Sequence, residues 1–65
     1  MDQIIYNGYK YKKLYAHANG GTYYVSQESD VVDSWLDVYP NGDVFYLWNG
    51  RLSRMGCLKN GIVIK

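Results

Sequence analysis

The sequence predicts an all-β fold, a small antiparallel meander that curls into a partly open barrel. The first observation is that each of the five asparagines is followed by glycine, and this dipeptide favours a β-hairpin turn because both residues tolerate positive φ. The second is that apolar and polar residues alternate between these turns, as in half-buried strands. The third is length, since 65 residues allow one small core. We therefore expect residues 1–65 to form a single small β domain.

The turns and the alternation divide the chain into seven expected strands. Each asparagine–glycine pair ends one apolar run and precedes the next, so neighbouring strands are expected to be antiparallel. A series of short strands joined in this way is typical of SH3-like or OB-like barrels. We expect the strands at residues 3–6, 9–16, 22–26, 35–39, 44–48, 51–55 and 62–64, with residues 56–59 linking the last two.

One segment departs from strand alternation. The apolar residues at positions 31, 32, 35 and 36 have helical spacing. Ser26 or Ser29 is available as an N-cap, and acidic residues follow in the first turn. The sequence therefore predicts one short helix near residues 28–34, with an acidic surface loop as the alternative.

A two-residue turn at Asn41-Gly42 assigns the aromatic residues around it to faces. Leu36 then lies opposite Leu47, and their face, which also holds Val38 and Phe45, is the aliphatic one and the natural core. The opposite face is amphipathic and aromatic, and Trp, Tyr and Arg are the usual hot-spot residues of interfaces. In the alternative, the barrel buries both faces and the tryptophans complete its core. The candidate partner-binding residues are Trp35, Asp37, Tyr39, Tyr46, Trp48 and Arg51.

A second segment interleaves aromatic and basic residues, as single-strand nucleic-acid binders do. The Asn7-Gly8 turn predicts Ile4, Tyr6, Tyr9 and Tyr11 on an inner face, with Lys13 and Tyr15 following. Most lysines then lie on the opposite face from the tyrosines, and the alternative is an edge that lysines protect from aggregation. The candidate nucleic-acid-binding residues are Lys10, Lys12, Lys13 and Arg54.

Cysteine and histidine counts exclude several chemistries. The chain has one cysteine, Cys57, and one histidine, His17, so neither an internal disulfide nor a four-ligand Cys/His zinc site is available. Phosphate-binding, redox and acidic metal-binding motifs are absent, and we expect no enzymatic activity, no cofactor and no metal. A single thiol favours a reducing compartment, so we expect a cytoplasmic protein. No apolar run approaches the roughly 20 residues of a membrane span.

Charge favours a protein partner over nucleic acid. The net charge is +1 and the pI about 7.8, well below the values of dedicated nucleic-acid binders. Residues 14–50 contain no Lys or Arg and hold five of the six acidic residues. We expect a small non-enzymatic protein that occupies a site on a partner protein, of the phage or mobile-element inhibitor type, since compact cysteine-poor β chains of this length are common there. A small nucleic-acid-binding barrel is the alternative.

Overall fold

The computed structural model describes residues 2–26, 35–48 and 50–65. The short helix predicted near residues 28–34 lies outside this range. Within it, every regular element is a β-strand. The described part of the chain has no helix of the length and apolarity needed to cross a membrane.

Seven strands follow one another along the chain, close to their predicted positions. The fourth strand ends one residue earlier than predicted, and the fifth begins one residue earlier. The sixth is longer, because it continues through residues 56–59, which the sequence analysis assigned to a link. The strands are β1 (Gln3–Tyr6), β2 (Tyr9–Ala16), β3 (Thr22–Ser26), β4 (Trp35–Val38), β5 (Asp43–Trp48), β6 (Arg51–Lys59) and β7 (Ile62–Ile64).

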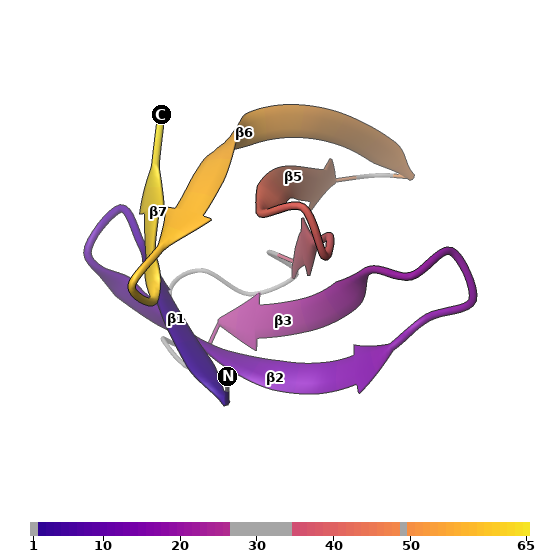
Figure 1. Cartoon of the computed structure of the whole chain (residues 1–65), viewed down its shortest axis with the longest axis horizontal. Helices are drawn as coiled ribbons and strands as arrows, with labels where there is room; N and C mark the ends of the chain where they lie inside the picture. The colour runs from indigo at the N-terminus through magenta and orange to yellow at the C-terminus, as the bar shows by residue number, and fades with distance from the viewer. Residues whose placement is uncertain (1, 27–34, 49) are drawn as a thin grey trace.

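The strands form a barrel in sequential order, from β1 round to β7. Neighbours along the chain pair antiparallel, and the barrel is closed by a parallel contact between β1 and β7 in which Ile5 lies opposite Ile62. The N–H of Ile5 donates to the carbonyl of Gly61 at 2.8 Å. Figure 1 shows β1 and β7 side by side, with the chain ends at this seam. The predicted all-β barrel is confirmed, and it is closed where the sequence predicted a partly open one.

The first and last hairpins have the predicted two-residue turns. Asn7 and Asn60 both have positive φ, 54° and 52°, and the glycine after each is also positive, as a type I′ turn requires. Tyr6 consequently pairs with Tyr9, and Lys59 pairs with Ile62. These registers confirm the inner tyrosine face predicted for the first hairpin as far as Tyr11.

The Asn41-Gly42 turn differs from the prediction by one residue. Gly42 has positive φ and Asn41 does not, and the N–H of Tyr39 donates to the carbonyl of Asp43 at 2.9 Å. The loop therefore holds three residues, a common hairpin geometry with glycine in the left-handed position. Val38 pairs with Val44 and Leu36 with Tyr46. The predicted faces are correct for β4 and inverted for β5, because a one-residue slip exchanges the two faces of a strand.

The barrel interior contains tyrosines among its aliphatic residues. Six apolar residues are buried there, and others from β1, β2, β5, β6 and β7 pack against them. No buried side-chain nitrogen or oxygen in the described residues lacks a hydrogen-bond partner, so the buried phenol groups are satisfied, as interior packing requires. The buried set is Ile4, Tyr11, Tyr24, Leu36, Val38 and Val44.

A β-bulge in β2 changes which side chains face outward. Lys13 pairs with Tyr24, but Tyr15 pairs with Tyr23, so Leu14 is an extra residue in the register. An extra residue reverses the alternation beyond it. Tyr15 therefore lies on the outer side with Tyr23, where the sequence analysis predicted the inner side.

Candidate functional site

Aromatic rings from β2 to β5 meet on the outer face of the barrel. The registers place Tyr23 opposite Asp37 and Asp37 opposite Phe45, so side chains of one row point to the same side. Tyr39 and His17 follow directly after β4 and β2. We call this set the outer aromatic surface, and it consists of Tyr15, His17, Tyr23, Trp35, Tyr39 and Phe45.

The rings of this surface form a continuous series of contacts. Tyr23 is central, with the Tyr15 and Trp35 rings each 5.4 Å away by centroid and the His17 ring at 4.6 Å. Tyr39 connects His17, at 5.7 Å, to Phe45, at 5.5 Å. Most of these pairs are nearly perpendicular, the arrangement that aromatic quadrupoles favour. The rings therefore support one another and form a preorganised surface.

A carboxylate lies beneath these rings. Asp37 is only 1% exposed although it is on the outer face of β4, and its Oδ1 lies 2.7 Å from Nε2 of His17. Asp37 also raises the pKa of Tyr39, first because the two side chains are hydrogen-bonded, with desolvation and the negative charge adding to the effect. Asp37 thus holds the His17 imidazole in place from below the surface.

Both nitrogens of His17 are engaged within the protein. The backbone N–H of Asn19 donates to Nδ1 at 3.2 Å, which leaves Nε2 as the donor to Asp37. Gly21 is buried against this pair, and a Cβ added there would overlap Oδ1 of Asp37 and Nε2 of His17. The contacts of His17 with Asp37 and Asn19 therefore fix the orientation of the imidazole at the end of the β2–β3 hairpin.

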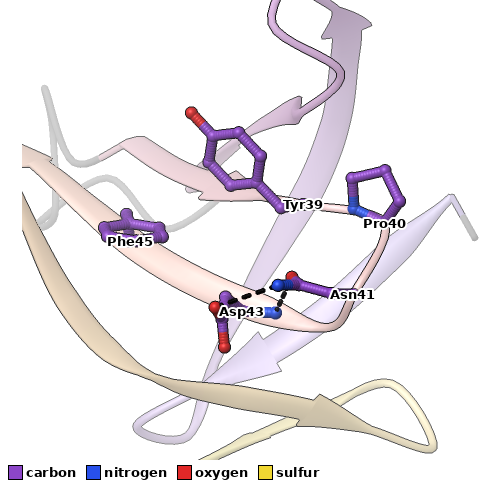
Figure 2. Close-up of a pocket in the computed structure, with 5 residues that line it drawn as sticks. All are labelled: Tyr39, Pro40, Asn41, Asp43 and Phe45. Carbon is purple, nitrogen blue, oxygen red and sulfur yellow. Dashed lines mark hydrogen bonds between the residues drawn. The ribbon is translucent and has the colours of Figure 1, made fainter.

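A hollow of about 470 Å³ lies beside the β4–β5 turn and is continuous with the outer aromatic surface. Figure 2 shows Tyr39 directly after β4, Phe45 on β5, and Pro40 and Asn41 at the turn between them. The fifth lining residue is Asp43, whose Oδ2 accepts a hydrogen bond from Nδ2 of Asn41 at 3.2 Å. Asn41 Oδ1 in turn accepts from the N–H of Asp43 at 3.0 Å. The hollow thus combines apolar walls with a fixed carboxylate.

Apolar and basic residues extend the outer face around these rings. A second row runs from Val25 through Trp35 and Leu47 to Leu52. Its last residue is 50% exposed, and Tyr15 is 51% exposed. Lys12 pairs with Val25 at one end of this row. The face is therefore amphipathic and open to solvent at both ends.

Three of the six predicted partner-binding residues lie together on this face. Trp35 and Tyr39 are half-buried, and Asp37 is beneath them. Because the register changes at the turn, Tyr46 instead packs against the core. Its ring centroid lies 6.5 Å from that of Tyr6.

The remaining predicted residues lie elsewhere. Arg51 is exposed and pairs with Trp48 through the backbone of β5 and β6, and the side chain of Trp48 lies outside the described part of the structure. Of the basic candidates, Lys10 and Lys12 alternate with the core-facing tyrosines of β2, and Lys13 is exposed opposite Tyr24. Arg54 lies opposite Phe45.

Sequence reasoning missed Tyr15, His17, Tyr23 and Phe45 as parts of this surface. Two single-residue irregularities account for two of them. The bulge in β2 places Tyr15 on the outer face, and the three-residue loop does the same for Phe45. The Pro40 that precedes Asn41-Gly42 was the available signal, because proline at the first central position favours a type I turn, which a left-handed glycine follows in three-residue hairpin loops.

Neither clusters of metal ligands nor known relatives point to a function. In residues 2–26, 35–48 and 50–65, no three His, Cys, Asp or Glu side chains come together as a metal site would require. No family model, no curated protein and no solved structure matches this chain. Function is therefore inferred from the geometry of the outer face.

Proposed function

We propose that this chain is a small non-enzymatic binding protein whose outer aromatic surface occupies a site on a partner protein. The proposed biological role is inhibition of a host or defence protein in the cytoplasm, of the phage or mobile-element type. The observation that supports it most is the continuous series of rings that remains partly exposed on the barrel exterior. Rings of this kind, held rigid before binding, lose little entropy when a partner covers them.

The internal bonding of His17 and Asp37 also supports binding over catalysis. Both imidazole nitrogens have partners, so the ring is committed to holding the surface. Catalytic bases need a nitrogen within reach of a substrate proton. The proposal therefore gives the pair a structural task beneath a contact surface.

We expect substitutions at exposed rings to abolish partner capture while the barrel stays folded. Tyr15→Ser removes a side chain that is 51% exposed, and Trp35→Ser removes one from the middle of the apolar row. Each is expected to reduce capture at least about tenfold, the usual effect of a hot-spot aromatic residue. The measurement is quantitative mass spectrometry of proteins retained from source-cell lysate by each immobilised variant, with circular dichroism to verify the fold.

Ile64→Ser is the matched control, because Ile64 is 45% exposed and lies on β7, three strands from β4 around the barrel. This variant should retain the same protein as the wild type. The proposal is wrong if capture survives both Tyr15→Ser and Trp35→Ser, or if Ile64→Ser removes it as completely.

The β2 bulge favours nucleic-acid binding as a second candidate. It places the Tyr15 ring outside, on the side to which Lys10 and Lys12 alternate, so stacking and phosphate contacts share one face. Lys12→Gln is then expected to weaken binding of a fluorescent oligo(dT) strand at low salt and to reduce its salt dependence by about one phosphate contact. Lys59→Gln, on β6, is the control. No anisotropy change at low salt would remove this candidate.

A further inference from the structure

We propose that the hollow beside the β4–β5 turn receives an arginine side chain of the protein partner. This inference rests on the proposed function, because the hollow is continuous with the outer aromatic surface. Its lining residues combine two rings, a proline and one carboxylate, Asp43. These groups suit an extended cationic side chain. The apolar wall packs against its aliphatic stem, and the ring faces and the carboxylate bind its charged head.

The rings are arranged to offer a face and an edge. The ring centroids of Tyr39 and Phe45 are 5.5 Å apart and the ring planes meet at 77°. Both side chains are half-buried. Tyr39 is supported on its other side by the His17 ring, whose centroid lies 5.7 Å away. A guanidinium stacks on such rings, because it is flat and more weakly hydrated than an ammonium group.

The carboxylate of Asp43 is fixed but not fully used. Asn41 Nδ2 donates to its Oδ2, which orients the group. Its Oδ1 is 3.1 Å from Nη2 of Arg54 in a pair whose side chains are 33% and 57% exposed, respectively. A carboxylate has about four acceptor positions, so room remains for a second donor. The Arg54 contact shows that this carboxylate is accessible to a guanidinium.

Charge along the chain favours a cationic occupant. The described strands β3, β4 and β5 contain no lysine or arginine, and their acidic residues are Asp37 and Asp43. Arg54, on β6, contacts Asp43 and offsets the charge of that carboxylate only. Buried Asp37 adds a negative charge behind Tyr39. An anionic partner group therefore meets repulsion here, whereas a cation is attracted.

Arg54 is consequently an internal competitor for Asp43. An exposed ion pair of this kind contributes little to stability, so a partner arginine displaces it readily. Removing Arg54 leaves Oδ1 of Asp43 without a cationic partner. Because that acceptor is then available, an added guanidinium should bind more tightly. No such gain is expected for a hollow that binds through apolar contact alone.

The test uses the full-length protein labelled with ¹⁵N and titrated with N-acetyl-arginine N-methylamide. We expect saturable shift changes confined to the amides of residues 39 and 41–45. Asp43→Asn is expected to weaken binding at least about tenfold, and Phe45→Leu about threefold. Arg54→Gln should tighten it about two- to fivefold. N-acetyl-citrulline N-methylamide, which has the same shape without the charge, is the matched control probe.

Four outcomes overturn the inference. The first three are no saturable shifts with the arginine probe, equal binding of the citrulline probe, and a loss of affinity in Arg54→Gln. Stronger binding of N-acetyl-proline N-methylamide than of the arginine probe also overturns it and assigns the hollow to a proline-rich segment. These results leave partner capture through Tyr15 and Trp35 untouched, so failure of the arginine site and failure of the proposed function are distinguishable.

Discussion

Gly56→Ala is expected to cost about 3 kcal/mol or more of folding free energy and to open the barrel at β7. Gly56 has φ of 152°, and a Cβ there would overlap the carbonyl oxygen of Ile64 and lie 2.8 Å from its carbonyl carbon. These are backbone atoms, so no rotamer change relieves the contact. Backbone strain and overpacking each cost about 1–3 kcal/mol. β7 must therefore move away, and with it the parallel contact that closes the barrel.

Urea unfolding followed by tryptophan fluorescence measures this loss. Gly8→Ala is the control, because Gly8 also has positive φ, 82°, but a Cβ there would meet nothing within 4 Å. That variant carries the conformational strain alone, about 1 kcal/mol. A domain of 65 residues has only a few kcal/mol of net stability, so Gly56→Ala should be largely unfolded at 37 °C. Equal losses in both variants would show that the close approach of β7 contributes nothing.

The strand positions were predictable because their signals are local. An asparagine–glycine pair needs only its own φ angles to form a type I′ turn, and Asn7-Gly8 and Asn60-Gly61 do so. Alternation between such turns then predicts each strand and its inner face. The all-β barrel followed from local rules of this kind.

The composition of the outer face was not predictable, because it depends on single-residue irregularities. The extra residue at Leu14 moved Tyr15 outward, and the three-residue loop moved Phe45 outward and Tyr46 inward. Each irregularity reverses every side chain beyond it. The aromatic residues were thus correctly expected to divide between core and surface, but several were assigned to the wrong side.

Asp37 is the residue whose role the sequence concealed most. A lone acid in an apolar strand indicates a solvated face, yet Asp37 is only 1% exposed and is bonded to His17. Its partner His17 is 20 positions away along the chain, and only the paired registers of β2, β3 and β4 bring the two together. Long-range pairs of this kind leave no local pattern.

Asp37→Ala is expected to cost about 3 kcal/mol and to disorder the outer aromatic surface. It leaves the largely buried His17 Nε2–H without its acceptor, and removing one partner of a buried, hydrogen-bonded pair of this kind costs about 3 kcal/mol. Asp43→Ala, in an exposed ion pair, is the control and should cost under about 1 kcal/mol. Urea unfolding gives both values, and a loss for Asp37→Ala as small as that of Asp43→Ala would contradict a supporting role.

Gly21 extends this prediction to a double-mutant cycle. Gly21→Ala introduces a Cβ that overlaps both Asp37 Oδ1 and His17 Nε2, so in the wild type it should cost about 2 kcal/mol. In the Asp37→Ala background one obstacle is gone and the imidazole is free to rotate, so the added cost should fall by at least about 1 kcal/mol. Strict additivity would instead mean that Gly21, His17 and Asp37 do not act as a unit. Coupling would establish that the hairpin end, the buried carboxylate and the rings above it are one rigid element, which a preorganised contact surface requires.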